Sequence, residues 1–206
     1  SYTATADDDD IIHGDVLILS APTLPAWLTF DGTATISGTP TNDDVGVHSI
    51  GLVVTDNSNV TTDQSFTITV ANTNDAPVFT SVAIITATED SLYSYSIISS
   101  DVDAGDLLVI TASTIPGWLE LVDNGDNTGT LEGTPENADV GDDNAVVLRV
   151  TDGSGDFDIQ SFTITVANTN DAPIFTSAGD TTATEDAEYS YTATADDDDI
   201  IHGDVL

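Results

Sequence analysis

The sequence predicts an all-β protein made of tandem Greek-key β-sandwich domains arranged end to end. The first observation is an internal repeat, because residues 1–17 and 190–206 are identical at an offset of 189 residues. A second identity, QSFTITVANTNDAP, runs from Gln64 to Pro77 and again from Gln160 to Pro173, an offset of 96. The two offsets leave 93 residues for the other unit. The chain is therefore a long repeat that holds two related domains.

The second observation is a set of short strands with a period of two. Residues 66–70, 93–97 and 162–166 alternate β-branched or aromatic residues with polar ones. Turn signals such as Asp31-Gly32 and Asn124-Gly125 separate such runs. Many short strands at this spacing are typical of a sandwich, and we expect seven strands in each domain.

Proline residues mark the expected domain boundaries, because Ala76-Pro77 and Ala172-Pro173 each follow a strong strand that proline prevents from continuing. We expect residues 1–76 to be a domain that lacks its first strand, and residues 77–172 to be a complete domain. Residues 173–206 would be the opening strands of a third. Those strands cannot form a sandwich alone, so two outcomes stay open: disorder, or completion of another molecule's first domain in head-to-tail self-assembly by strand complementation.

The charge is strongly acidic, with 37 Asp and Glu residues against the single basic residue Arg149. A net charge of −36 repels nucleic acid and anionic membranes and attracts cations. No apolar run approaches the roughly 20 residues that span a bilayer, so membrane insertion is not expected. Because the chain has no cysteine, a stabilising element other than a disulfide is needed, and bound divalent metal or high external salt would provide one.

The segments around each proline resemble the inter-domain linkers of cadherins. Val70-Ala-Asn-Thr-Asn-Asp-Ala-Pro-Val-Phe79, and its copy at 166–175, are similar to the cadherin linker Asp-x-Asn-Asp-Asn-Ala-Pro. An acidic pair follows twelve residues after each proline, and Asp101-Val-Asp103 resembles the Asp-x-Asp motif of that family. Val150-Thr-Asp152-Gly resembles the later Ala-x-Asp-Gly motif.

The tryptophan-containing stretches add to this resemblance. Pro25-Ala-Trp27-Leu and Pro116-Gly-Trp118-Leu, each followed by Gly-Thr-Pro and Asp-Val-Gly, are similar to dystroglycan-type cadherin-like and immunoglobulin-like repeats. Such repeats occur in large bacterial surface proteins. The resemblance covers both units and implies a cadherin- and immunoglobulin-like sandwich. We expect Trp27 and Trp118 to be core residues packed between the sheets and not platforms that stack on sugars.

Ca²⁺ is the cofactor that the resemblance implies, bound at the linkers. Ca²⁺ takes 6–8 oxygen ligands from carboxylates and carbonyls, and an acidic linker between two domains can gather them. We expect one ligand set at each junction and do not fix the number of ions. The metal-ligating residues expected by matching the motifs are Asp8, Asp10, Asp43, Asp56, Asn74, Asp75, Glu89, Asp101, Asp103, Asp139, Asp152, Asn170, Asp171, Glu185, Asp197 and Asp199.

The expected function is mechanical and not enzymatic. The sequence offers no nucleophile with a partner histidine, and acidic pairs that recur in every linker differ from a single catalytic pair. We expect His13, His48 and His202 to lie at the surface. The chain would be a calcium-stabilised extender or fibre-forming region of an extracellular or cell-surface adhesin, with neighbouring repeats as its partners. The alternative is a module that binds carbohydrate or protein through a loop or a tryptophan.

Overall fold

The computed structural model describes residues 1–9, 11, 14 and 16–202 as an all-β chain. The chain divides into two compact units, Ser1–Asn74 (unit 1) and Asp75–Leu206 (unit 2). Strands and short 3₁₀ helices are its regular elements, and the predicted fold class is confirmed. None of the helices in the described part of the chain is long and apolar enough to cross a membrane.

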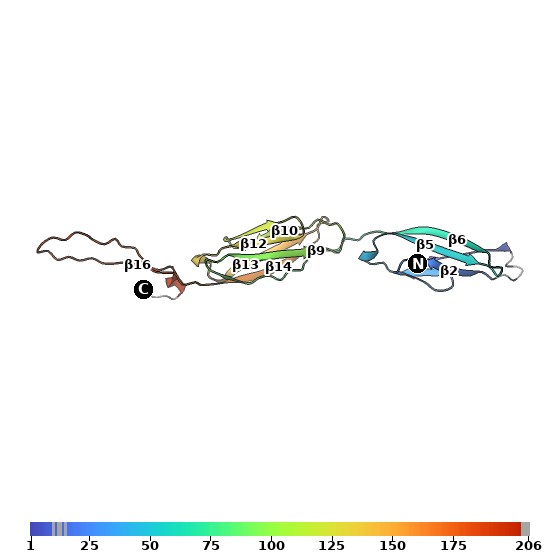
Figure 1. The fold of residues 1–206 in the computed structure, drawn as a ribbon, viewed down its shortest axis with the longest axis horizontal. Coiled ribbons are helices and arrows are strands. Elements are labelled where there is room, and N and C mark those ends of the chain that lie inside the picture. The colour runs from blue at the N-terminus through green and yellow to red at the C-terminus, as the bar shows by residue number, and fades with distance from the viewer. Residues whose placement is uncertain (10, 12–13, 15, 203–206) are drawn as a thin grey trace. The chain divides into compact units, whose positions relative to one another are not determined.

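Unit 2 contains a sandwich of two four-stranded sheets (Figure 1). One sheet has the strand order β10-β13-β14-β8 and the other has the order β11-β12-β9-β7. The strands are β7 (Val78–Phe79), β8 (Thr86–Thr88), β9 (Tyr93–Ser100), β10 (Val109–Thr114), β11 (Leu119–Asp123), β12 (Thr128–Gly133), β13 (Gly141–Thr151) and β14 (Phe157–Ala167).

The core of this sandwich follows the alternation in the sequence. In β9, buried and exposed residues alternate along the whole strand, so that Tyr93, Tyr95 and Ile97 face the other sheet. Leu148 of β13 and Ile164 of β14 are fully buried from the opposite side. Apolar side chains from both sheets thus meet in one core, and their burial is the main source of stability.

This sandwich has one strand more than the seven expected, because its opening segment is divided between the two sheets. β7 pairs antiparallel with β9 through Val78↔Ser100 and Phe79↔Ser99. β8 pairs in parallel with β14 through Thr86↔Thr165 and its neighbours. The segment between β7 and β8 crosses from one sheet to the other, so a single predicted strand becomes two.

Trp118 packs at the margin of the core. Its ring lies edge-on to Tyr93, with the ring centres 5.7 Å apart. Its Nε1–H donates to Asn144 Oδ1 at 2.9 Å. The indole is half-buried and has a polar partner, as is usual for a tryptophan near a core.

Unit 1 repeats the pattern with six strands among its described residues. Its two three-stranded sheets have the orders β1-β4-β3 and β2-β5-β6. The strands are β1 (Tyr2–Thr3), β2 (Ile18–Thr23), β3 (Leu28–Phe30), β4 (Thr35–Gly38), β5 (Gly46–Thr55) and β6 (Thr61–Val70).

His48 is half-buried, and its predicted surface position is wrong. The ring lies edge-on to Trp27 with centres 5.8 Å apart, and Nε2 lies 2.6 Å from the carbonyl oxygen of Asp44. His48 packs here because it follows Gly46 by two residues in β5 and therefore faces inward with Ile50. His13 lies outside the described residues.

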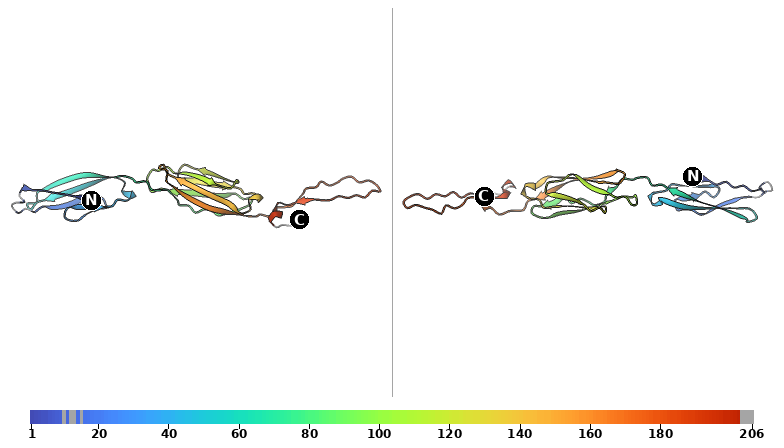
Figure 2. Two further views of the ribbon diagram at one scale, coloured as in Figure 1. Left: turned by 180° about the vertical axis from the view of Figure 1, so that it is seen from behind. Right: turned by 90° about the horizontal axis from the view of Figure 1, so that it is seen from above.

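The last part of unit 2 runs out and back as two extended segments (Figure 2). They are joined at their base by β15 (Ile174–Phe175) and β16 (Ala195–Asp196), which pair antiparallel. A 3₁₀ helix, η4 (Asp198–His202), follows. Most side chains of the two segments are exposed, including Phe175 and Tyr189.

Candidate metal-binding centres

Four carboxylates and a linker amide near the start of unit 2 form what we call the Asp103 cluster (Asp75, Asp101, Asp103, Asp106 and Asp152). Carboxylate oxygens of Asp101, Asp103 and Asp106 lie within 4.8 Å of one another. Asp103 and Asp152 are only 5% and 6% exposed. Like charges this close repel each other by roughly 1 kcal/mol per pair in water, and by more where water is excluded.

Backbone amides fix the orientation of these carboxylates. The Asp103 amide donates to Asp101 Oδ1 at 2.9 Å, and the Asp75 amide donates to Asp103 Oδ2 at 2.7 Å. Asp152 Oδ1 accepts the amides of Gly155 and Asp156, at 2.6 and 2.8 Å, within its own turn. Each of these aspartates thus uses one oxygen as a structural acceptor.

The remaining oxygens of two of these aspartates have no such partner. Asp101 Oδ2 and Asp103 Oδ1 are buried without a hydrogen-bond partner among the described residues. A buried, unsatisfied carboxylate oxygen is costly, and a hard cation satisfies it better than any neutral donor. The donor set consists of oxygen only, which suits Ca²⁺ or Mg²⁺ and not Zn²⁺.

Asp106 responds to the same crowding. Its pKa is raised from the usual value by burial and by the charges of Asp101, Asp103 and Asp152. The charges of Asp101, Asp103 and Asp152 therefore all act on Asp106.

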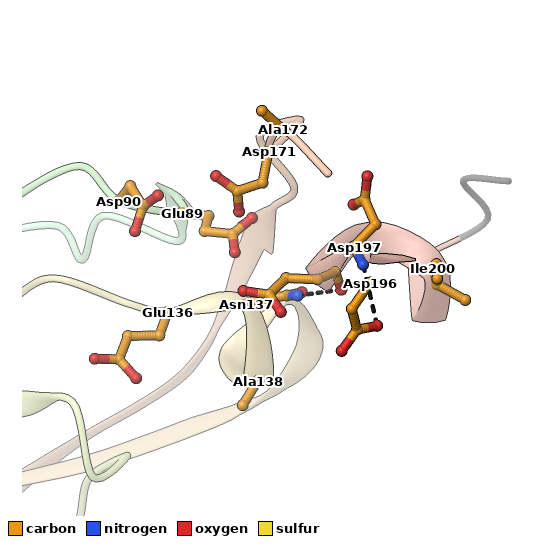
Figure 3. Close-up of a pocket in the computed structure, with 11 residues that line it drawn as sticks. Glu89, Asp90, Glu136, Asn137, Ala138, Asp171, Ala172, Asp196, Asp197 and Ile200 are labelled. Carbon is orange, nitrogen blue, oxygen red and sulfur yellow. Dashed lines mark hydrogen bonds between the residues drawn. The ribbon is translucent and has the colours of Figure 1, made fainter. Parts of the chain in front are cut away.

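A second acidic cavity of about 790 Å³ lies farther along unit 2 (Figure 3). Figure 3 shows its walls coming from four parts of the chain: the turn after β8, the 3₁₀ helix η3 (Asn137–Asp139), the linker and the start of η4. We call the acidic residues around this cavity, together with Asn137, the Glu89 cluster, after the most buried carboxylate among them. It comprises Glu89, Asp90, Glu136, Asn137, Asp171, Asp197, Asp198 and Asp199.

The Glu89 cluster repeats the scaffold of the Asp103 cluster. The Asp199 amide donates to Asp197 Oδ1 at 3.0 Å, and the Asp171 amide donates to Asp199 Oδ2. These contacts correspond to Asp103–Asp101 and Asp75–Asp103 at an offset of 96 residues. Asp199 is 2% exposed, and its Oδ1 is buried without a hydrogen-bond partner, as Asp103 Oδ1 is.

Glu89 adds a buried carboxylate that ties β8 to the linker. It is 1% exposed, and its Oε2 accepts the Thr169 amide at 3.0 Å. Its own amide donates to the Ala167 carbonyl at 3.0 Å. Asp171 lies on the other wall, and its pKa is raised by burial and by the charges of Asp90 and residues 197–199.

Two residues expected as ligands at this junction, Asp139 and Asn170, and a further expected ligand, Glu185, do not line the cavity. Asp139 Oδ2 accepts the Glu136 amide at 2.9 Å, because Asp139 caps the 3₁₀ helix η3. It is therefore not part of the cavity wall. Asn170 is exposed and donates to the Asp171 carbonyl at 2.7 Å, and Glu185 is exposed on the extended segment.

The expected ligands in unit 1 are dispersed. Asp43 is exposed in η2 (Asn42–Asp44), and Asp56 Oδ1 accepts the amides of Ser58 and Val60, both at 2.8 Å. Asp8 and Asn74 are half-buried. Asp10 lies outside the described residues.

Sequence reasoning missed several acidic residues that the fold brings into the two clusters. Asp106 follows Asp103 by three residues within a tight turn. This spacing could have indicated that Asp106 belongs to the same acidic cluster. Asp90 follows Glu89 directly in the acidic pair, but the motif match selects only Glu89. Glu136 and Asn137 enter the cavity from a 3₁₀ helix that the strand pattern does not predict.

Two β-sandwich units with acidic clusters beside a linker define a cadherin- and immunoglobulin-like tandem-domain protein. The chain belongs to the family described as Putative Ig domain, whose model matches residues 1–71 and 76–167. Comparison with curated proteins found no relative.

Solved structures of cadherin repeats share this fold. The chain aligns with Protocadherin Gamma B2 extracellular cadherin domains 1-5 at a TM-score of 0.59 and 16% identity, over 79% of this chain and 34% of the other. The Protocadherin GammaB4 extracellular domain aligns at a TM-score of 0.57 and 18% identity, over 88% and 32%.

An enzyme also contains a similar segment. The endo-fucoidan hydrolase MfFcnA4 from glycoside hydrolase family 107 is 29% identical at a TM-score of 0.42, over 76% of this chain and 24% of that one. The chain thus spans about a quarter to a third of the length of these proteins.

Proposed function

We propose that this chain is a calcium-stabilised structural repeat, an extender or fibre-forming region of an extracellular adhesin or surface filament. Its role is mechanical and not enzymatic, and its partners include the neighbouring repeats of the same protein. The observation that carries the proposal is the scaffold that occurs twice. In each copy a linker amide holds one oxygen of a buried aspartate, while the other oxygen has no hydrogen-bond partner.

Calcium fits this scaffold for electrostatic reasons. Each cluster joins residues from a linker to residues from the loops of a sandwich, so a bound cation would tie the linker to the sandwich. Without the cation, the carboxylates repel one another and the linker is free to move. The calcium-loaded linker would then be stiff, which is what an extender requires. Affinity in the range of ~10⁻⁴–10⁻³ M is typical of extracellular calcium modules.

A direct test compares Asp103→Asn with the unchanged chain in a calcium titration of thermal unfolding. Asparagine keeps an oxygen for the Asp75 amide but removes the charge that faces the cluster. We expect calcium to raise the melting temperature of the unchanged chain strongly, and to raise that of Asp103→Asn much less. Small-angle scattering should show an increase in maximum dimension with calcium that the variant loses.

Glu120→Gln is the matched control, because Glu120 is exposed in β11, opposite Glu132 in β12 and remote in sequence from the cluster residues. It removes one charge without touching either cluster. An equal loss of the calcium response in both variants would mean that calcium acts on overall charge. No response to calcium or chelator in the unchanged chain would overturn the proposal.

A further inference from the structure

The sheet β10-β13-β14-β8 of unit 2 has a largely apolar outer face around the single basic residue of the chain. Val109, Phe157 and Ile159 are 50%, 48% and 51% exposed there. Side chains at alternate positions of a strand point to the same side, so two neighbouring cross-strand rows share this face. The rows, which we call the arginine face, are Val109–Thr151–Phe157 and Thr111–Arg149–Ile159. Neither row contains an acidic residue, although the chain has 37.

The charge of Arg149 is not neutralised within the described part of the chain, where no carboxylate forms a salt bridge with it. Its Cζ atom lies 3.9 Å from the centre of the Phe157 ring. A guanidinium held over a ring keeps N–H donors for an acceptor. Arginine and aromatic residues are enriched in the centres of protein interfaces. The arginine face therefore suits a surface that combines carboxylates with apolar side chains.

The other sheet of unit 2 has an outer face of that kind. Glu120 of β11 lies directly opposite Glu132 of β12, and both are exposed. Val122 lies one row farther along this face and Ile98 two rows, and they are 44% and 50% exposed. Like charges directly opposite each other destabilise a sheet, and this pair has no cation beside it in its own sheet. We call these four residues the glutamate face.

Unit 1 has neither the arginine nor the glutamate pair at the corresponding positions. At the offset of 96 residues, Val53 corresponds to Arg149. The glutamate pair is replaced by Thr29 and Ser37, which pair in the same register. The sandwich fold therefore requires neither feature, and the two occur together in unit 2. Their joint presence favours a shared role over a structural one.

The two faces are complementary, but they cannot meet within one sandwich. They are the outer faces of opposite sheets, so the core of unit 2 lies between them. Only a second copy of the chain can bring a glutamate face against an arginine face. Sheets that pack face to face lie about 10 Å apart, which places their side chains in contact. The glutamates would then gain the counter-charge that their own sheet lacks.

We propose that the arginine face of one copy packs on the glutamate face of a second copy. Arg149 lies between Glu120 and Glu132 of the second copy, and the apolar residues of the two faces are buried together. The contact is heterologous, so copies join side by side and a third copy can add to the pair. This lateral contact goes beyond the calcium-dependent role and does not depend on it.

Sedimentation velocity over a series of concentrations tests the pairing with the 206-residue chain. EDTA and about 0.5 M sodium chloride in the buffer remove bound calcium and shorten the range of general repulsion. We expect the mean mass of the unchanged chain to rise with concentration. Arg149→Glu should weaken association by more than about tenfold, because like charges then face each other across the contact.

A charge exchange identifies the two faces that meet. Glu120→Lys/Glu132→Lys should stay monomeric alone, as should Arg149→Glu, and a mixture of the two variants should associate. The mixture restores opposite charges, and a change of folding in either variant could not restore association. Asp63→Lys/Glu188→Lys is the matched control, because it changes the net charge equally at exposed acids outside both faces. It should associate at least as well as the unchanged chain.

Three results would overturn the proposal. One is a chain that is monomeric at every concentration. Another is association that persists in Arg149→Glu. The third is a mixture of the two charge variants that does not associate, which would mean that Arg149 meets carboxylates of another surface. Calcium titration of the monomeric Arg149→Glu variant reads the calcium proposal separately, so failure of one proposal leaves the other intact.

Discussion

The close approach of β11 and β12 restricts position 133 to glycine. Gly133 lies opposite Leu119 in the β11–β12 pair, where a Cβ atom would lie 1.9 Å from the Trp118 carbonyl oxygen. Gly38 has the same constraint, with a Cβ at 1.8 Å from the Trp27 carbonyl oxygen. The Gly-Thr-Pro sequence that follows each tryptophan therefore has a steric reason in both units.

Gly133→Ala should destabilise unit 2 by about 3 kcal/mol, since backbone must move to relieve the contact and overpacking commonly costs 1–3 kcal/mol. Urea unfolding followed by tryptophan fluorescence measures the change. Gly117→Ala is the control, because nothing lies within 4 Å of its Cβ position. Equal midpoints for the two variants would contradict the steric argument.

Tyr93 should make unit 2 sensitive to alkaline pH. Burial and the neighbouring Tyr95 raise the pKa of its hydroxyl to about 12, from a usual value of 10.0. Because the folded pKa is the higher one, the stabilisation is complete below pH 10 and is lost as pH rises to 12. The expected loss is on the order of 2 kcal/mol.

Urea unfolding at several pH values between 9 and 12, in EDTA, measures this loss. Tyr93→Phe cannot ionise at that position, so its stability should fall less over the same range. The variant should be less stable at pH 9, because the hydrogen bond to the Ile84 carbonyl is removed. Parallel pH profiles for the two proteins would rule out Tyr93 as the cause.

At the scale of elements, one aspartate organises the turn between β3 and β4. Asp31 Oδ1 accepts the amides of Thr33, Ala34 and Thr35, at 2.8, 2.9 and 3.0 Å. These bonds hold the pKa of Asp31 well below its usual value, with the Thr35 amide as the largest cause. The lowered pKa means that the ionised form stabilises the folded turn, and that this stabilisation is lost as pH falls below 3.8.

Asp31→Asn should therefore lower the melting temperature of unit 1 at neutral pH, and the difference from the unchanged chain should shrink below pH 3.8. Melting curves at pH values from 7 down to 2 measure it, and the difference should shrink steadily below pH 3.8 because the folded pKa lies well below that value. Asp63→Asn is the control, because Asp63 is an exposed acid of β6. A difference that does not shrink at all between pH 4 and pH 2 would show that charge at Asp31 is not the cause.

The elements that the sequence predicted well are those with a clear period of two. The predicted runs at 66–70, 93–97 and 162–166 each lie within a longer strand, β6, β9 and β14 respectively. The division into β7 and β8 could not be predicted, because the choice between sheets depends on pairing with β9 and β14, which are distant in the sequence. The 3₁₀ helices are too short for a periodic signal.

The candidate site was predictable only in part, for a related reason. Motif spacing selected Asp103, Asp171 and Asp199, and the structure places all three within the two clusters, where their contacts involve nearby residues and the linker. Motif spacing also selected Asp139, which lies at η3, where its Oδ2 accepts the Glu136 amide, and which does not line the cavity. Spacing along the chain does not show which side chains also cap a 3₁₀ helix, because the caps depend on the local backbone.

At the scale of the whole molecule, the excess of acid decides which conditions stabilise the chain. Of its charges, 37 are acidic, and the single Arg149 lies over the ring of Phe157 at 3.9 Å from the ring centre. Salt shortens the range of repulsion from about 10 Å at 0.1 M to about 3 Å at 1 M. In EDTA, added sodium chloride should therefore raise the free energy of unfolding by general screening. The increase should level off at high salt concentration.

Calcium should act in addition to that screening. A cation that binds only the folded state adds about 1.4 kcal/mol per site for each tenfold rise in its free concentration above the dissociation constant. Unfolding free energies measured at several calcium concentrations in 1 M sodium chloride should therefore rise linearly with the logarithm of calcium. The slope counts the sites, and at least one should be lost in Asp103→Asn. A slope is expected even in 1 M salt, because a diffuse atmosphere of sodium cannot replace an ion bound between Asp101 and Asp103. A flat line would mean that the carboxylates need only screening, and it would contradict the proposed site.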